Sequence, residues 1–317
     1  IHFLTRQEEY TMLLEIAIAD AYGLGFEFMP QEFVDANNNL SQYHSHQKYK
    51  TVPGTYSDDA QMSIAITNLL LQTVKSNPGK NPTSYLTPVM FADAFYETFK
   101  QDPRDGYARG FQSVLEKISS GTEMIEVIEA YGKTTSNGAA MRACPIGLFF
   151  DYPTQVLDVA AIQGSVTHEG TGILAAQIVA LATMYMKHRV RINTVRPFHK
   201  QVYDYLNEQL KYHKLITESI DFNYDGSRVA GKVDLGLKTA IAAVHCAATT
   251  KSYSECLLKA VSFGGDTDSV AAIACGILSA SNNIMDHRHD KRIPIQLIDG
   301  LEDGPFGIGY LINIDNQ

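Results

Sequence analysis

Two acidic turns, far apart in the sequence, precede apolar segments with helical spacing. The first is Ser57-Asp58-Asp59-Ala60-Gln61 and the second is Gly264-Gly265-Asp266-Thr267-Asp268-Ser269. Runs of Ala, Ile, Val and Leu follow both turns, which predicts two helices whose N-termini enter the core. Carboxylates packed this closely repel one another unless they share a counter-ion. With the neighbouring hydroxyls they form the all-oxygen ligand set that Mg²⁺, Mn²⁺ and Ca²⁺ prefer, so a two-metal site is the leading hypothesis.

The first acidic turn has an alternative explanation as an ordinary helix N-cap, because a Ser or Asp there satisfies free backbone amides. A cap needs one such residue, whereas Ser57, Asp58 and Asp59 stand in succession before the apolar helix. The helix dipole would keep these carboxylates ionised, which suits metal binding. Taken alone, this turn leaves both interpretations open.

The second acidic turn points more strongly to function. On a regular helix Asp266 and Asp268 would point roughly 200° apart, so they converge only if the first lies in the turn and the second opens the helix. The pair Gly264-Gly265 gives the backbone that freedom. Residues 270–276 form a helix buried nearly all round, and polar residues at the end of so buried a helix need partners.

The apolar spacing is helical nearly everywhere, and strand-like alternation is hard to find over more than four positions. Sequence breaks at residues 77–82, 102–103, 151–153 and 223–226 divide the chain into roughly ten to thirteen helices. With 317 residues, 45% of them hydrophobic, the chain can bury a large core. We find no repeat and no interdomain linker, and we predict a single compact all-α domain over residues 1–317.

Charge and cysteine content narrow the function classes. The formal net charge of −9 argues against a non-specific nucleic-acid binder, because no basic face is there to neutralise phosphates. Cys144, Cys246, Cys256 and Cys275 lack C-x-x-C spacing, so we expect buried free thiols in a reducing compartment. No apolar run approaches the ~20 residues that span a membrane. We expect a soluble, cytoplasmic monomer, although the sequence does not exclude a removed leader.

Three further segments carry weaker signals, each with a structural alternative. Asp20 ends an apolar helix and Glu27 follows two glycines, which spacing alone explains as a helix end with a surface Glu. His168 opens another apolar helix, and a lone His is more often a structural hydrogen-bonding group than a ligand. Residues 136–142 place small residues and an Arg at a helix start, which suits an anion or nucleotide contact and suits tight helix packing equally well.

Together these segments resemble the ADP-ribosylglycohydrolase family, which includes the dinitrogenase-reductase-activating glycohydrolases. The matching segments keep the family's order and run from about residue 12 to residue 281. The most specific is the family's G-G-D-T-D-T-V-A-A-I-A-G, which resembles residues 264–276. The others are a GDA-x-G-x-x-x-E-F start (Ala19 to Phe28), a T-D-D-T-Q-M turn (Ser57 to Met62), G-N-G-A-A-M-R (Ser136 to Arg142) and T-H (Thr167-His168).

The resemblance implies an orthogonal helical bundle with two divalent cations, Mg²⁺ or Mn²⁺, in a cleft. It also implies that Glu27 is a mobile acidic residue near the metals and that Asp20 supports the first acidic turn. The family's metal-ligand places fall on Ser57, Asp58, Asp59, Asp266, Asp268 and Ser269. Its ADP-ribose contacts fall on Asn137, Gly138, His168, Gly264 and Gly265.

The departures from the family pattern are small. Ser57 and Ser269 stand where the family has Thr, which preserves the oxygen ligand but loses the methyl that fixes its rotamer. Ala19 and Ser136 replace Gly, and Ala60 replaces Thr. No carboxylate is lost, so these changes bear on substrate fit more than on metal binding.

The implied reaction is hydrolysis of the glycosidic bond between ADP-ribose and a modified acceptor, either a protein side chain, with arginine first, or a small molecule. It passes through an oxocarbenium-like state that needs a positioned nucleophile and nearby negative charge. Two metals can orient the ribose hydroxyls and lower the pKa of a bound water. Asp59 or Glu27 could then act as acid or base. A non-catalytic ADP-ribose-binding relative, like the eye-lens crystallin, and an unrelated two-metal phosphohydrolase are the alternatives.

The segment before and after Glu27 also predicts motion. Gly23 and Gly25 flank Leu24, so the chain can hinge there. We expect the loop from about Phe26 to Thr51, rich in Asn, Gln and His, to be more mobile without ligand than the helices around it.

Overall fold

The computed structural model describes residues 12–49, 51–188, 196–281 and 292–317. These ranges form sixteen α-helices and one 3-10 turn, and their only β-pairing is two isolated bridges. The all-α prediction is therefore confirmed. The longer helices are α1 (Leu13–Leu24), α3 (Asp58–Ser76), α4 (Pro88–Gln101), α6 (Gly121–Tyr131), α9 (Pro153–Gly164), α10 (Gly170–His188), α11 (Phe198–Tyr212), α12 (Leu235–Thr249), α13 (Tyr253–Ser262) and α14 (Thr267–Ser279).

The described residues form more helices than the predicted ten to thirteen, because several of them are short. One of them, α2, lies inside the expected 26–51 loop. The short elements are α2 (Gln31–Asn37), η1 (Pro82–Ser84), α5 (Arg109–Leu115), α7 (Gly138–Met141), α8 (Cys144–Phe149), α15 (Ile295–Gly300) and α16 (Ile308–Asp315).

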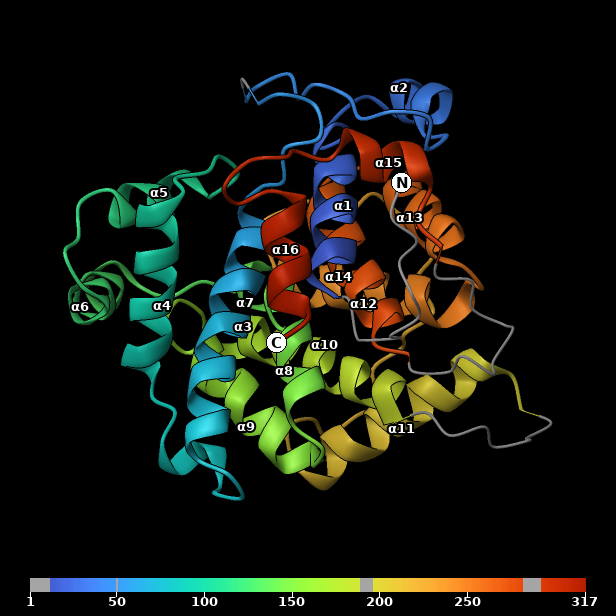
Figure 1. Ribbon diagram of the computed structural model, residues 1–317. Coiled ribbons are helices and arrows are strands. Elements are labelled where there is room, and N and C mark those ends of the chain that lie inside the picture. The colour runs from blue at the N-terminus through green and yellow to red at the C-terminus, as the bar shows by residue number, and fades with distance from the viewer. Residues whose placement is uncertain (1–11, 50, 189–195, 282–291) are drawn as a thin grey trace.

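Helices α1 and α14 form the centre of the bundle (Figure 1). Every residue of both helices is buried, as their nearly unbroken apolar sequences require. The two helices approach closely at Gly23, where a Cβ would lie 2.6 Å from the Cα of Asp268. The Thr267 hydroxyl donates to the Gly23 carbonyl at 2.7 Å, so the end of α1 is fastened to the start of α14. This contact brings the segment after α1 beside the second acidic turn.

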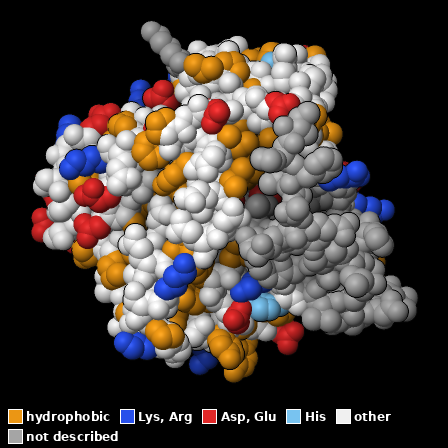
Figure 2. Space-filling model, viewed as in Figure 1, with side chains coloured by type: hydrophobic (Ala, Val, Ile, Leu, Met, Phe, Trp, Pro, Cys, Tyr) orange, Lys and Arg blue, Asp and Glu red, His pale blue; other side chains and the backbone are white. Residues whose placement is uncertain are grey.

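The remaining helices surround this pair. Helix α3 packs against α1 and α14, with α4 and then α6 outside it (Figure 1). On the other side, α12 and α13 cover α14, while α10 packs against α7, α8, α9 and α12. Over α5 and α6, acidic and basic side chains lie interspersed on the face shown in Figure 2.

Several of these helices begin at a conventional N-cap. The Ser120 hydroxyl accepts the backbone N–H of Glu123 at 3.2 Å, and the Ser252 hydroxyl accepts that of Glu255 at 3.1 Å. The Glu255 carboxylate in turn accepts the N–H of Lys251 at 2.7 Å. In these two turns, a Ser with a Glu three residues later satisfies the free amides that a helix start exposes.

Two further predictions concern the state of the cysteines and membrane-spanning helices. All four cysteines are buried and free, as expected from their spacing and apolar neighbours. In the part of the chain that the structure describes, no helix is both long enough and apolar enough to cross a bilayer.

Candidate metal and substrate site

The first acidic turn begins α3, and Ser57 is its N-cap residue. The Ser57 hydroxyl does not cap the helix. It donates to Asp20 Oδ1 at 2.7 Å. Asp20 Oδ2 accepts the backbone N–H groups of Ser57 and Ala60, both at 2.9 Å. Asp20 therefore caps α3 from another helix, and the explanation of Ser57 as an ordinary N-cap is wrong. Asp20 also lies inside α1, which continues to Leu24, so the prediction that it ends a helix is wrong too.

The second acidic turn uses both of its glycines. Gly264 and Gly265 have φ values of +67° and +85°. A Cβ on Gly265 would lie 1.9 Å from the carbonyl oxygen of Val229, which accepts the N–H of Asp266 at 2.8 Å. Asp266 is the N-cap residue of α14 and Asp268 lies in its first turn, as predicted from the sequence.

The structure brings the two acidic turns together. The Ser269 hydroxyl lies within hydrogen-bonding reach of the carboxylates of Asp59 and Asp266. The Asn137 amide donates to Asp266 Oδ2 at 3.1 Å. The two turns also interact electrostatically, because the charge of Asp266 helps to raise the pKa of Asp58 and of Asp59. Side chains from three distant parts of the sequence thus meet at one place.

The electrostatics of this cluster favour protonation. Burial, followed by repulsion from Asp20 and Asp58 respectively, raises the pKa of Asp58 and of Asp59 well above the usual range. Burial and then the charge of Glu27 raise the pKa of Asp266, and raise that of Asp268 further. A low-dielectric setting with several negative charges makes the ionised forms costly unless a cation is shared.

The donor atoms suit a hard divalent cation. Among the described residues, Asp59 Oδ1 and Asp268 Oδ1 are buried and have no hydrogen-bond partner. Such atoms are costly to leave unsatisfied, and carboxylate oxygens are the ligands that Mg²⁺ and Mn²⁺ prefer. No three His, Cys, Asp or Glu side chains within the described ranges already stand in a metal-binding geometry. The carboxylates would therefore have to turn toward a shared ion.

Glu27 lies near this cluster, just beyond the end of α1. After burial, its charge is the largest cause of the raised pKa of Asp268. The backbone N–H of the next residue, Phe28, donates to the Gly265 carbonyl at 2.7 Å. Phe28 has a φ of +54° and is 54% exposed. The segment that carries Glu27 is therefore tied to the second acidic turn.

His168 is held by protein groups at both ring nitrogens. Arg142 Nη2 donates to the Thr167 hydroxyl at 2.9 Å, and this hydroxyl lies 2.7 Å from His168 Nδ1. The other ring nitrogen, Nε2, lies 3.1 Å from the Ser136 hydroxyl. Burial, with the Arg142 charge, lowers the pKa of His168 to about 3. The imidazole is thus neutral near pH 7.

The His168 ring supports the turn that carries the predicted ADP-ribose contacts. A Cβ on Gly138 would lie 3.0 Å from the ring's Cε1, so the glycine permits close packing. Asn137, the preceding residue, contacts the acidic cluster through its hydrogen bond to Asp266. The predicted contact between His168 and a substrate stays a prediction, and the structure itself assigns the ring a supporting place.

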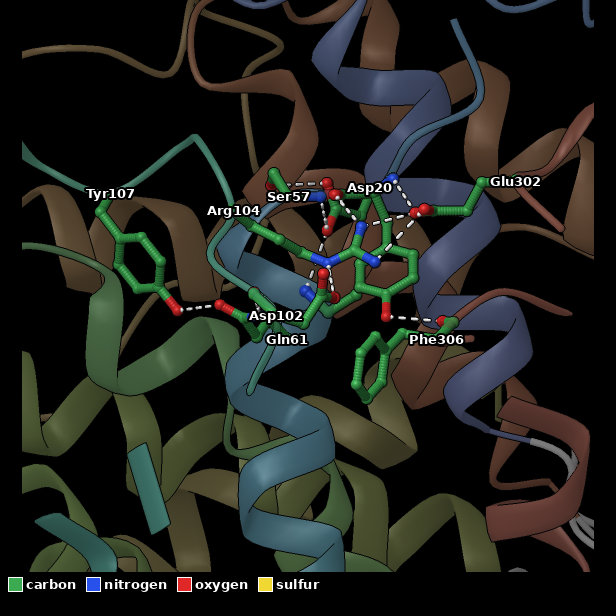
Figure 3. A network of polar contacts seen from close by, with 10 residues as sticks. Asp20, Ser57, Gln61, Asp102, Arg104, Tyr107, Glu302 and Phe306 are labelled. Atoms are coloured by element: carbon green, nitrogen blue, oxygen red, sulfur yellow. Dashed lines mark hydrogen bonds and ion pairs between the residues drawn. The ribbon is translucent and has the colours of Figure 1, made fainter. Parts of the chain in front are cut away.

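Sequence reasoning missed Arg104, which organises the back of the first acidic turn (Figure 3). Its Nη1 donates to the Tyr56 carbonyl at 2.8 Å, and its guanidinium lies 3.4 Å from the centre of the Tyr56 ring. It also forms ion pairs with Asp102 and Glu302. The residues of this network come from distant parts of the chain, so no local pattern marks them. A lone Arg beside a Pro in a polar segment carries no signal.

The segment after Arg104 covers Asp58. Gly106 has a φ of +119°, and a Cβ there would lie 2.1 Å from Asp58 Oδ1. The Tyr107 hydroxyl donates to Gln61 Oε1 at 2.6 Å, and the Gln61 amide donates to the Asp102 carbonyl (Figure 3). This glycine is therefore required for close approach to the acidic cluster, a role that the sequence alone did not reveal.

Fold and site together define an all-α protein whose distant acidic turns meet at one oxygen-rich site. The family model for ADP-ribosylglycohydrolase matches residues 10–305, and the chain belongs to this family. It is 23% identical over 283 residues to the ADP-ribosyl-[dinitrogen reductase] glycohydrolase of Rhodospirillum rubrum, covering 86% of this chain and 85% of that protein. It is 28% identical over 141 residues to the ADP-ribosylhydrolase ARH3 of Xenopus tropicalis, covering 41% and 36%.

A solved structure supports the same fold. The chain superposes on an ADP-ribosylglycohydrolase-related protein complex with a TM-score of 0.62, covering 96% of this chain and 93% of that one. The two sequences are 16% identical, so this likeness concerns the fold alone. The family resemblance seen in the sequence motifs is confirmed.

Proposed function

We propose that this protein is a metal-dependent ADP-ribosylglycohydrolase, active as a single domain on an ADP-ribosylated protein or small molecule. Family membership supports hydrolysis of ADP-ribose linkages. The observation that carries the proposal is the meeting of two distant acidic turns, with a buried, unpartnered oxygen on Asp59 and another on Asp268. Buried carboxylates with strongly perturbed pKa values are typical of functional sites.

Two divalent cations, Mg²⁺ or Mn²⁺, fit the oxygen donors of the cluster. When bound, they would orient the ribose hydroxyls and lower the pKa of a bound water. The residues that would hold them are Ser57, Asp58, Asp59, Asp266, Asp268 and Ser269.

Side chains and backbone groups of the protein would transfer the proton and bind the ADP-ribose. Asp59 or Glu27 would accept or return a proton, because each is a carboxylate at the cluster. Asn137 and Gly138 would contact the ADP-ribose, as would the backbone of Gly264 and Gly265.

The acceptor is the finer part of the proposal. We propose ADP-ribosyl-arginine first, because the resemblance to glycohydrolases that activate dinitrogenase reductase points there, and ADP-ribosyl-serine second. Fold similarity does not decide between acceptors, because substrate choice depends on the site rather than on the fold.

The test is mass spectrometry of peptides that carry ADP-ribose on arginine or on serine, incubated with the protein and Mg²⁺ or Mn²⁺. We expect free ADP-ribose and an unmodified arginine peptide, with no release in EDTA. The matched control is Asp268→Asn, which should bind ADP-ribose weakly and release none. ADP-ribose binding without release from either peptide would favour a binding-only relative. No binding at all would favour the phosphohydrolase alternative.

A further inference from the structure

The segment after α2 carries a histidine whose ring faces Glu27. His46 Nε2 lies 3.0 Å from Glu27 Oε2, and both side chains are largely buried, at 5% and 14% exposed. His46 lies nineteen positions along the chain from Glu27, beyond α2, and no sequence motif connects the two residues. The contact therefore arises from the fold of the 26–49 segment.

Backbone geometry assigns the tautomer of His46. Its Nδ1 accepts the backbone N–H groups of Lys48 at 3.1 Å and of Tyr49 at 3.0 Å. A nitrogen that accepts two N–H donors carries no proton of its own, so the ring proton lies on Nε2. His46 therefore donates a hydrogen bond to Glu27, and the direction of that bond is set by the turn at residues 46–49.

The His46 ring is fixed independently of Glu27. It stacks on the Tyr49 ring, with centroids 4.5 Å apart and planes 24° from parallel. The Tyr49 hydroxyl accepts a hydrogen bond from Lys48 Nζ at 2.7 Å, and it lies 3.5 Å from the Gly106 carbonyl. The charges of Glu27 and Asp268 both help to raise the pKa of Tyr49, which places this ring beside the acidic cluster. The imidazole is thus held before any substrate arrives.

We propose that His46 is a positioning residue for Glu27: its Nε2–H holds Oε2 and leaves Oε1 free for the reacting centre. This inference rests on the proposed glycohydrolase function, in which Glu27 is an acid–base candidate. Among the described residues, His46 is the side chain that forms an ion pair or hydrogen bond with this carboxylate. Glu27 follows a glycine-containing turn. Without the hydrogen bond from His46, its side chain would be free to rotate away from the second acidic turn.

Two conservative substitutions separate positioning from mere support of the loop. His46→Gln keeps an N–H donor at the place of Nε2 and loses the acceptor for the two amides. His46→Asn keeps that acceptor, but its shorter side chain places no N–H donor at the position of Nε2. If His46 acts through Glu27, His46→Asn should lower kcat by about 10- to 100-fold with little change in KM, while His46→Gln keeps most of the activity. The reverse pattern would overturn the proposal.

Glu27→Gln supplies the second control. His46→Asn should cause no further loss of kcat in the Glu27→Gln background, because the group on which it acts is already disabled. A full additional loss in the double variant would show that His46 acts elsewhere and would overturn the proposal.

A spectroscopic measurement tests the contact without relying on activity. In protein labelled with ¹⁵N-histidine, long-range correlations should show His46 protonated at Nε2 and unprotonated at Nδ1, with the signal assigned by its loss in His46→Asn. Glu27→Ala should shift the Nε2 resonance. The opposite tautomer, or a resonance that Glu27→Ala leaves unchanged, would overturn the positioning role. If the tautomer and the shift are as expected but no ADP-ribose is released, the proposed function fails and the contact stands.

Discussion

Replacing Asp268 by Asn should stabilise the protein without metal and destabilise it relative to wild type when metal is present. Burial, then repulsion from Glu27 and Asp266, raises the pKa of the Asp268 carboxyl well above its usual range. Asn has nearly the same shape and no charge, and its amide can donate to the neighbouring Asp266 carboxylate. The substitution therefore removes a cost that only a cation otherwise offsets.

The magnitude follows from two opposing effects. An unsatisfied buried polar group such as Asp268 Oδ1 costs about 1–3 kcal/mol. A negative charge in the first turn of a helix contributes about 0.5 kcal/mol, which Asn forfeits. The first effect wins, and the net gain of roughly 1–2 kcal/mol corresponds to a rise in Tm of about 1.5–3 °C for a domain of this size.

Bound metal should make the wild type more stable than the Asp268→Asn variant. A cation at about 100 times its Kd would stabilise the wild type by about 2.7 kcal/mol and the variant by little. The assay is thermal unfolding in EDTA and in Mg²⁺ or Mn²⁺, with Asp158→Asn on the exposed face of α9 as the matched control, which should change neither curve. The reasoning is refuted if Asp268→Asn lowers Tm in EDTA, or if metal raises the Tm of the variant as much as that of the wild type.

Three further predictions follow from the same features. Burial raises the pKa of Asp20 and of Asp315 to about 6, so the stability they contribute is complete below the unfolded value near 3.8 and is lost as pH rises through 6. Metal-free protein should therefore melt at a higher temperature at pH 5.5 than at pH 8, and a flat profile would contradict this. Gly106→Ala should weaken Mn²⁺ binding measured by calorimetry, whereas Gly132→Ala, with a similar positive φ but nothing within 4 Å, should not. Amides in the 26–49 segment should exchange faster than those of α14 without ligand and slow when ADP-ribose and metal bind, and equal protection would count against the expected motion.

Much of the fold was predictable because the apolar spacing of the long helices is strong. The nearly continuous Ala, Ile and Val after Asp268 predicted a buried helix, and α14 is buried along its whole length. The position of Asp266 before that helix followed from the preceding glycines, since a regular helix would separate the two carboxylates. Short helices such as α7, with four residues, leave too few periods for spacing to detect them.

The candidate site was predictable only where its residues are local in sequence. The acidic turns carry their own pattern, but the partner of Ser57 is Asp20 on another helix. Arg104 and His46 act through contacts to Tyr56 and Glu27 that only the tertiary fold creates. Isolated charged residues in polar segments look like solvated surface until the chain is folded.

The most direct test of the central claim is diffraction from crystals soaked with ADP-ribose and Mn²⁺, using the anomalous signal of the metal. The account predicts two Mn²⁺ ions about 4 Å apart between the turns at residues 57–59 and 266–269, with the ribose hydroxyls facing them. Bound ADP-ribose with no anomalous peak between the two turns, or metal held elsewhere, would contradict it.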